Sequence, residues 1–346
     1  MKIDFIIIGQ GIAGTCFAFE LIRRNKSFVI IDKYDSTSSS QIALGVYNPL
    51  VLKWFTKVWN VDNQLHDFNI FYNDLKSIST DTFAYDNGIY KFLHNPYDQN
   101  NWLSKSSNRN TSLYMSSDLK SINNPGLVFN KFFGLVNFSG RVDVQLLLNS
   151  FRSYCKSVNK LINEQFDYKS LTVNNNLISY KKIKADKIIF CEGYKAVDNP
   201  FFSKIKFKPT KGELLVIYSK NLDLDKIIHS KFLFIPLGND YYSVGATYNW
   251  NDITNETTLN GRQQLVNMLD SFLQVPYKII HHKAGIRPSI FDRRPVVGSH
   301  SEHKNMYILN GLGTRGVLLA PYLSNVLCNY IYNNTLINLE IDYSRM

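Results

Sequence analysis

The sequence predicts a mixed fold, α/β in its parallel-sheet part and α+β overall, in which a parallel-sheet domain is interwoven with an antiparallel-sheet domain. Three observations support this prediction. The chain opens with a strand–glycine loop–helix–strand unit (3–32), a strand ending in a glycine turn lies in the middle (184–193), and a second strand–glycine loop–helix unit closes it (306–332). β-Rich segments (81–138 and 206–250) lie between these parts. Two domains woven together therefore fit better than two consecutive domains.

Hydrophobic periodicity predicts the helices and strands, and residue composition predicts the loops and exposed faces. Residues 95–112 (NPYDQNNWLSKSSNRNTS) have the composition of a loop. The stretch 203–213 (SKIKFKPTKGE), with alternating lysines, is typical of the exposed face of a strand. The remaining predicted elements are strands at 3–8, 28–32 and 184–193, helices at 12–24, 60–80, 142–158 and 259–273, and a strand, loop and helix at 306–332.

The composition indicates a globular protein with a sizeable core. Lys and Arg number 39 against 28 Asp and Glu, a net charge of +11. Such an excess is compatible with nucleic acid, anionic lipid or an acidic substrate, but the lysines are dispersed, which favours a solvated surface. The four cysteines are far apart and form no metal or disulfide framework. No signal peptide or run of about 18 apolar residues is evident, so a cytoplasmic protein is predicted.

The opening motif GQGIAG has the form G-x-G-x-x-G between a strand and a helix. In such units Gly9 permits the tight turn, Gly11 lets the backbone approach a pyrophosphate, and Gly14 packs the helix on the strand. Asp32 ends the second strand, where an acidic residue binds a ribose hydroxyl. These parts together predict a dinucleotide site. The motif is common to NAD and FAD, whereas Asp32 disfavours the 2′-phosphate of NADP.

Further segments resemble the FAD-dependent D-amino-acid oxidase superfamily. They are SSSQIALGVYNP (38–49), KIIFCEG (187–193), AGIRPSIFDRRPVVG (284–298) and MYILNGLGTRGVLLAP (306–321). That superfamily includes glycine oxidase, sarcosine oxidase and the flavin domain of the bifunctional tRNA wobble-uridine-modifying enzyme. The resemblance is strongest in the first 50 and last 65 residues.

The resemblance implies a discontinuous, Rossmann-like FAD-binding domain (1–60, 140–205 and 285–346) and a substrate domain (61–139 and 206–284). It also implies that FAD is bound non-covalently, because no cysteine has the tail position at which sarcosine oxidases attach flavin. The cofactor-binding residues expected from motif and resemblance are Gly9, Gly11, Ile12, Ala13, Gly14, Asp32, Lys33, Ser39, Ser40, Ala43, Gly45, Cys191, Gly193, Gly311, Gly313, Thr314, Arg315, Gly316 and Val317.

Each of these segments also has a purely structural interpretation. The serine-rich segment could be a polar linker, the turn after Cys191 a simple strand end, and the tail loop a packing turn. Two glycine loops that bracket the chain favour the cofactor, because Gly313 to Val317 would present the positive end of a second helix. In the superfamily this helix end faces the N1/C2-carbonyl side of the flavin and stabilises its reduced, anionic form.

Arg287, in AGIRP, matches the arginine that binds the substrate carboxylate in amino-acid oxidases of this type. Its planar fork makes two parallel hydrogen bonds to a carboxylate, which lysine cannot do. The alternative is a salt bridge to Asp292 or a similar residue. Tyr248 could cover the same site, or it could only pack within the sheet.

The chain departs from the pattern in the tail loop. Glycine oxidase-like sequences carry His-Phe-Arg-Asn between the loop glycines, whereas this chain has Leu312, Gly313, Thr314 and Arg315, so its arginine is shifted by one position. The adjacent His281 and His282 do not predict a metal site, because neighbouring residues on a strand point to opposite faces.

The leading hypothesis is an FAD-dependent oxidoreductase that oxidises a CH–NH bond of an amino acid or secondary amine by hydride transfer to flavin N5, with oxygen or another acceptor reoxidising the flavin. A second hypothesis is flavin-dependent modification of the wobble uridine of tRNA, suggested by the net charge and by GVYNP (45–49). A third is a non-catalytic flavin-binding redox module. The sequence indicates no particular oligomeric state.

Overall fold

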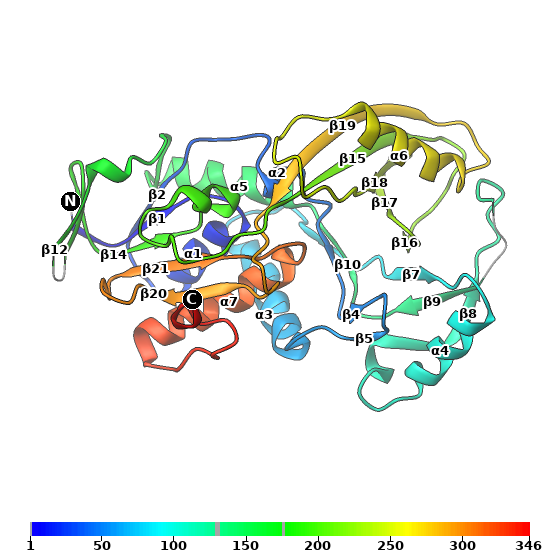
Figure 1. The fold of residues 1–346 in the computed structure, drawn as a ribbon, viewed down its shortest axis with the longest axis horizontal. Helices are drawn as coiled ribbons and strands as arrows, with labels where there is room; N and C mark the ends of the chain where they lie inside the picture. Colours follow the sequence, from blue (N-terminus) through cyan, green and yellow to red (C-terminus); the bar gives the residue numbers. More distant parts are fainter. Residues whose placement is uncertain (1, 129–131, 175–176) are drawn as a thin grey trace.

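A computed structural model describes residues 2–128, 132–174 and 177–346. Two lobes, each built on an eight-stranded sheet, lie beside each other along the long axis of the molecule (Figure 1). One sheet is mainly parallel and contains the N-terminal strand, and the other is mainly antiparallel. Both chain termini lie in the parallel-sheet lobe (Figure 1). This arrangement confirms the predicted fold class.

The parallel sheet has the strand order β11-β2-β1-β14 and forks at β14 (Ile183–Phe190). The first residues of β14 pair with antiparallel β13, and its last residues pair with parallel β21. Ile8 stands opposite both Ile31 and Phe190, so the strand ends meet at one edge, where parallel sheets bind ligands. The other strands are β1 (Lys2–Ile8), β2 (Phe28–Ile31), β11 (Leu161–Ile162), β12 (Leu171–Asn174), β13 (Leu177–Tyr180), β20 (Val296–Ser299) and β21 (Met306–Asn310).

Strand β1 is buried on both faces, as expected for a central parallel strand. Phe5 and Ile7 join the core formed with the main helices of this lobe, and Ile6 and Ile8 join a second core on the opposite face. Helix α5 shows why the sequence folds this way, because its buried residues recur at helical spacing and the Asp143 side chain accepts from its N-terminal backbone. The helices are α1 (Ile12–Arg23), α3 (Val61–Asp74), α5 (Val144–Ser157) and α7 (Gly316–Asn333).

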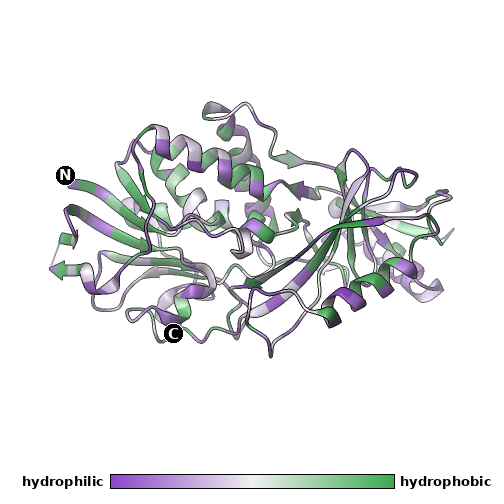
Figure 2. Ribbon diagram, turned by 90° about the horizontal axis from the view of Figure 1, so that it is seen from above, coloured by the Kyte–Doolittle hydropathy of each residue, from purple (hydrophilic) through white to green (hydrophobic). Residues whose placement is uncertain are grey.

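The antiparallel sheet has the order β19-β15-β18-β17-β16-β7-β9-β8. Leu265 and Leu269 of α6 (Leu259–Asp270) pack on Leu215 and Ile217 of the sheet. In Figure 2, hydrophilic and hydrophobic residues form stripes along the helices, as this one-sided burial requires. The strands are β7 (Ile89–Phe92), β8 (Met115–Ser121), β9 (Phe132–Val136), β15 (Thr210–Tyr218), β16 (Ile227–His229), β17 (Leu233–Gly238), β18 (Tyr241–Gly245) and β19 (Lys278–Arg287).

Short elements lie between or beside the two large sheets. Strand β10 pairs with β3 and β6, and β4 pairs with β5. They are β3 (Val46–Tyr47), β4 (Leu50–Val51), β5 (Thr56–Lys57), β6 (Ala84–Tyr85) and β10 (Gly140–Val142), the short helix α2 (Ser39–Ile42), and 3₁₀ turns at Leu75–Ser77, Ser112–Tyr114, Tyr168–Ser170, Gly193–Asp198 and Tyr343–Arg345.

The predicted loop at 95–112 is wrong, because α4 (Pro96–Ser106) occupies most of it. The Asn95 side chain caps the helix, Pro96 takes the first helical position, and Trp102 is fully buried against Gly134. The polar composition reflects the exposed side of this helix. The other predicted elements are confirmed to within a few residues, except that lysines 204–208 are exposed on an irregular segment rather than a strand.

The division into two domains remains a proposal. Strands from three separate stretches of chain build the parallel sheet, which supports the interwoven arrangement. Strand β19 continues to Arg287, two residues beyond the predicted start of the last FAD-domain segment at 285. None of the helices in the described part of the chain is long and apolar enough to cross a bilayer.

Candidate functional site

A long cavity lies between the lobes and receives residues from both sheets. The edge of the parallel sheet contributes the loops after β1, β2, β14 and β21, and the antiparallel sheet contributes β15 and β19. The predicted residues that line it are Gly9, Gly11, Ile12, Ala13, Asp32, Lys33, Ser39, Ser40, Ala43, Gly45, Cys191, Gly193, Tyr248, Arg287, Gly313, Thr314, Gly316 and Val317. The predicted residues that do not line it are Gly14, Gly311 and Arg315.

The glycines of the opening motif differ in what surrounds them. Gly9 has φ +95°, and a Cβ there would lie 2.5 Å from the carbonyl oxygen of Cys191. A Cβ on Gly14 would lie 2.0 Å from the carbonyl oxygen of Gly9, so only glycine lets α1 approach β1 this closely. A Cβ on Gly11 would meet only the Ser40 hydroxyl, at 3.1 Å. Gly9 and Gly14 are therefore structural requirements, whereas Gly11 keeps space open at the cavity wall.

The N-terminus of α1 offers backbone N–H groups to the cavity. Gly11 caps this helix without a side-chain hydrogen bond, and the first turn carries no acidic residue. The Ile12 N–H donates to Ser40 Oγ at 3.2 Å, which brings the serine-rich segment beside the helix end. A helix N-terminus without a carboxylate of its own favours an anionic ligand group.

Asp32 lies on the cavity wall but already has two protein partners. Its Oδ1 accepts from the Gln10 N–H at 3.0 Å, and its Oδ2 accepts from Arg152 Nη1 at 2.6 Å. Arg152 is buried and also donates to Gln10 Oε1 and Asn163 Oδ1. A role for Arg152 was not predicted from the sequence. This residue lies 120 residues from Asp32, and the sequence of its helix indicated mainly an apolar face. Its burial orients the Asp32 carboxylate at the end of β2.

The ends of β14 and β21 are tied together beside the cavity. Asn310 is buried, and its Nδ2 donates to the carbonyl oxygen of Gly193 at 2.9 Å. Gly193 has φ +59°, and a Cβ there would meet nothing within 4 Å, so its conformation rather than crowding favours glycine. Asn310 was not predicted either, although it stands directly before the tail glycine loop.

Glu192, between Cys191 and Gly193, should make the stability of the protein depend on pH. Burial raises its pKa to about 7, although Tyr168 and Asn199 donate hydrogen bonds to the carboxylate. A raised carboxyl pKa contributes stability below its ordinary value of 4.5, and this contribution is lost as the pH rises through about 7. Glu192→Gln should therefore be more stable than the wild type at pH 8, by about 3 kcal/mol, with the difference vanishing near pH 4. Urea unfolding across this pH range measures it.

The control is Glu164→Gln. The hydrogen bond from Lys181 lowers the pKa of Glu164, so its contribution is present at neutral pH and lost on acidification, with the opposite sign. If the free energies of unfolding of wild type and Glu192→Gln changed with pH in parallel, the raised pKa of Glu192 would be refuted.

The tail loop presents a second helix end to the cavity. Gly313 has φ +55° and an open environment, and Thr314, Gly316 and Val317 line the cavity at the start of α7. Gly311 has φ +75°, but a Cβ there would clash with Ile290 at 2.4 Å. Gly311 is thus required for packing, while the residues after it form the cavity wall.

Arg315 does not line the cavity. Its Nη1 and Nη2 donate to the carbonyl oxygens of Asn48 and Leu50, each at 3.3 Å. The guanidinium therefore holds the segment at β3–β4 against the start of α7. This arginine is shifted by one position relative to the family pattern. Its side chain makes a structural contact and does not line the cavity wall.

Arg287 ends β19 with its side chain on the cavity wall. The guanidinium lies over Gly212, where a Cβ would come within 2.2 Å of Nη2. Its only hydrogen bond among the described residues is a long one, 3.5 Å, from Nη1 to the Thr247 carbonyl oxygen. The alternative of a salt bridge to Asp292 is wrong, because the Asp292 carboxylate pairs with Arg345. Burial lowers the pKa of Arg287, the expected effect on a cation that lacks a carboxylate partner.

Tyr248 lies over this arginine. The centre of its ring is 4.5 Å from Arg287 Cζ, and 57% of the residue is exposed. The alternative that Tyr248 only packs within the sheet does not fit this exposure. The two predicted catalytic residues therefore meet at one end of the cavity.

The adjacent histidines of β19 differ in their surroundings. His282 Nε2 lies 2.8 Å from Glu213 Oε2, whereas no polar partner is assigned to His281. Across residues 2–128, 132–174 and 177–346, no group of three or more His, Cys, Asp and Glu side chains could hold a metal ion. All four cysteines are buried, and none forms a disulfide.

Comparison with known proteins identifies the family of this chain. The family model described as FAD dependent oxidoreductase (DAO) matches residues 4–330. The chain belongs to this family. FAD is therefore its cofactor, and the predicted oxidoreductase class and superfamily are confirmed.

Individual relatives are similar in sequence to this chain over part of their length. The chain is 29% identical to the glycine oxidase of Bacillus licheniformis over 132 residues, which are 37% of this chain and 36% of the relative. It is 23% identical to the tRNA 5-methylaminomethyl-2-thiouridine biosynthesis bifunctional protein MnmC of Idiomarina loihiensis over 129 residues, 36% of this chain and 21% of that protein. The matches thus span about a third or less of these relatives.

The fold is shared over the whole chain. The crystal structure of glycine oxidase from Bacillus cereus superposes with a TM-score of 0.82, at 19% identity, and the match covers 98% of this chain and 99% of that one. At this identity the likeness shows the fold alone.

The described residues fit FAD. The open wall at Gly11 and two helix N-termini at one cavity are compatible with a pyrophosphate and a flavin ring.

Proposed function

We propose that this FAD-dependent oxidoreductase oxidises the CH–NH bond of a small amino acid or secondary amine that carries a carboxylate. The observation behind the proposal is Arg287, a partly buried guanidinium on the cavity wall without a carboxylate partner among the described residues. A substrate carboxylate would supply two charge-assisted hydrogen bonds to it. Gly212 leaves room for the guanidinium itself, and Leu214, Leu233 and Ala246 also line the cavity.

The cofactor would lie along the rest of the cavity. The α1 N-terminus and Ser40 would hold the pyrophosphate, Asp32 would accept from a ribose hydroxyl, and Thr314 to Val317 would face the flavin. Bound FAD supplies the hydride acceptor, flavin N5. The chain's own contribution is to bind the carboxylate at Arg287, to place Tyr248 over it, and so to orient the amine carbon.

The residues around Arg287 include no described carboxylate or histidine on the cavity wall, since Asp32, Asp35 and Glu192 lie at the nucleotide end. A neutral amine would therefore bind and lose a hydride from carbon and a proton from nitrogen. The imine so formed is hydrolysed by water. Oxygen or another acceptor would complete the cycle.

An anaerobic panel of amino acids and secondary amines tests this proposal. Addition of the substrate should bleach the visible flavin spectrum of the purified holoprotein. Methylamine, which lacks a carboxylate, and propionate, which lacks an amine, serve as matched controls and should not bleach it. If no amine reduces the flavin, the proposal fails and a non-catalytic flavin module becomes the better interpretation.

A second candidate is modification of the wobble uridine of tRNA. The likeness to MnmC and the net charge of +11 favour it. Binding of tRNA that weakens steeply with salt is the expected result under this hypothesis. Absence of tRNA binding at low salt would exclude it.

A further inference from the structure

The segment that carries Tyr248 leaves the antiparallel sheet after β18 and crosses to the opposite face before α6. None of the residues from 248 to 258 is buried, and we call this segment the Tyr248 loop. A loop without buried side chains is expected to open easily unless polar contacts restrain it.

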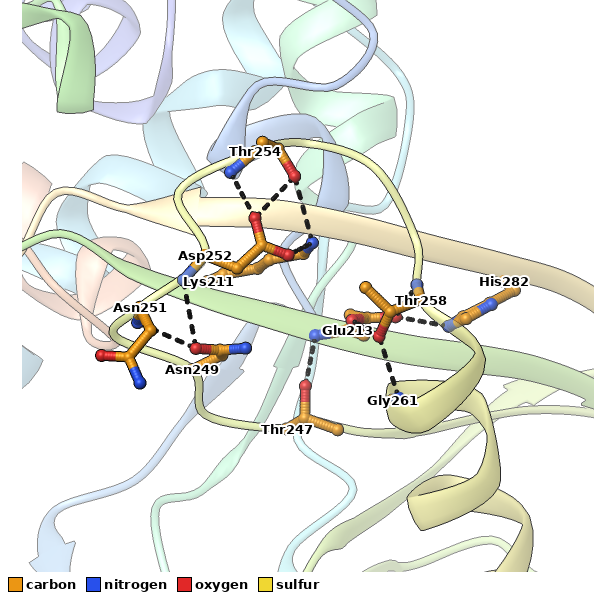
Figure 3. A network of polar contacts seen from close by, with 10 residues as sticks. All are labelled: Lys211, Glu213, Thr247, Asn249, Asn251, Asp252, Thr254, Thr258, Gly261 and His282. Atoms are coloured by element: carbon orange, nitrogen blue, oxygen red, sulfur yellow. Dashed lines mark hydrogen bonds and ion pairs between the residues drawn. The ribbon is translucent and has the colours of Figure 1, made fainter.

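Polar contacts restrain the loop at both ends. Near its middle, Asn255 Nδ2 donates to the Thr37 hydroxyl at 2.9 Å, and the contacts that flank Tyr248 come from β15. Lys211 and Glu213 lie on one face of this strand, and Gly212, between them, faces the cavity and Arg287 (Figure 3). The backbone of Lys211 exchanges two hydrogen bonds with Asn249, of 2.9 and 3.0 Å. Glu213 N–H donates to Thr247 Oγ1 at 2.9 Å. These bonds flank Tyr248 on both sides.

The Lys211 side chain holds the turn that follows. Its ammonium group is fully buried, pairs with the Asp252 carboxylate and lies 3.3 Å from Thr254 Oγ1 (Figure 3). The same carboxylate accepts from the Thr254 N–H at 2.9 Å. The hydrogen bond from Lys211 holds the pKa of Asp252 well below its ordinary value, at about 2.

Glu213 holds the far end of the loop. Its carboxylate accepts from the Thr258 N–H at 2.9 Å and from the Thr258 hydroxyl at 2.8 Å, and Thr258 caps α6 (Figure 3). Gly261 lies against the Glu213 carboxylate, because a Cβ at Gly261 would lie 2.4 Å from the carboxyl carbon. Glu213 thus secures the junction with α6, whereas Lys211 pairs with Asp252 in the turn next to Tyr248. The Asn249 side chain also holds this turn, because it accepts from the Asn251 and Asp252 N–H groups at 2.9 and 3.2 Å.

We propose that Lys211 is a positioning residue for the substrate carboxylate, acting through Asp252 and the Tyr248 loop. It holds Tyr248 over Arg287 and so limits the positions that a carboxylate can take there. The idea rests on the proposed role of Arg287. It adds that affinity for the carboxylate depends on a buried ion pair on the opposite face of the sheet.

Lys211→Met is the main test, since it keeps the length of the buried side chain and leaves only the partly exposed Asp252 unpaired, where water can hydrate it. In the holoprotein, the dissociation constant of acetate, read from the flavin spectrum, should rise about tenfold. With an amine substrate, KM should rise similarly while kcat stays within about twofold. Lys181→Met, which removes the exposed ion pair with Glu164 in the other lobe, should change neither.

A double-mutant cycle shows whether Lys211 acts through Tyr248. In a Tyr248→Ala background, Lys211→Met should cause no further loss of acetate affinity, because coupled residues are non-additive. Equal losses in both backgrounds would overturn the proposal.

Hydrogen exchange gives a readout that needs no ligand. The amides of Thr247 and Asn249 should exchange about tenfold faster in Lys211→Met, while those of β1 stay unchanged. If Lys211→Met does not fold, Asp252→Ala tests the same point, because Lys211 would then need the turn to open for hydration. Unchanged exchange would overturn the positioning role, whereas faster exchange in a holoprotein without acetate affinity would overturn only the proposed carboxylate site.

Discussion

Arg287→Met should reduce kcat/KM for the amine substrate by about a thousandfold. Two charge-assisted hydrogen bonds to a carboxylate are worth roughly 2 kcal/mol each, about 4 kcal/mol together. Methionine removes both donors but retains much of the buried volume over Gly212. Steady-state kinetics and acetate titration measure the loss, and the flavin content should stay at the wild-type level because Arg287 lies at the substrate end.

Arg287→Lys separates geometry from charge. Lysine keeps the cation but not the planar fork, so we expect an intermediate loss, mostly in KM. Arg262→Met, at an exposed position on α6, is the control and should leave the kinetics unchanged. Wild-type kinetics in Arg287→Met would remove the observation on which the proposed function depends.

Gly14→Ala should damage both the fold and FAD binding. Alanine is favoured over glycine in a helix by about 1 kcal/mol. The added Cβ would, however, lie 2.0 Å from the backbone oxygen of Gly9, which cannot move without separating α1 from β1. The clash should win, lowering the free energy of unfolding by about 3 kcal/mol. Urea unfolding and flavin retention on gel filtration measure the two effects.

Gly11→Ala is the matched comparison in the same motif. Its Cβ would meet only the Ser40 hydroxyl at 3.1 Å, and a serine side chain can rotate away. Stability should therefore change by less than about 0.5 kcal/mol, while FAD affinity falls because the methyl group occupies the open wall. If Gly11→Ala destabilised the protein as much as Gly14→Ala, the division of roles within the motif would be wrong.

The parts of the site that consist of residues close together in the sequence could be predicted. A glycine loop after a buried strand has the same backbone requirements in any protein, so GQGIAG and the tail loop predicted a ligand site, and most of their predicted residues line one cavity. Helix α4 was missed because a polar surface helix with one buried tryptophan has nearly the composition of a loop.

Contacts between distant segments were not predictable. Arg152 reaches Asp32 across 120 residues, and Asn310 reaches Gly193 across 117. Arg152 follows Leu148 by four residues on the buried face of α5, and this spacing distinguishes it from an exposed arginine but does not identify its partner. The side-chain direction of Arg315, toward Asn48 and Leu50, also depended on a segment more than 260 residues away.

The sequence by itself determined the two glycine loops, the acidic end of β2 and hence a dinucleotide, because these properties follow from backbone geometry over a few residues. The tertiary structure decided which groups share the cavity. It left Arg287 without a carboxylate partner by pairing Asp292 with Arg345, and it placed Lys211 behind Tyr248. Pairing between charges depends on which loops and turns the fold brings together, and that arrangement is a property of the folded chain.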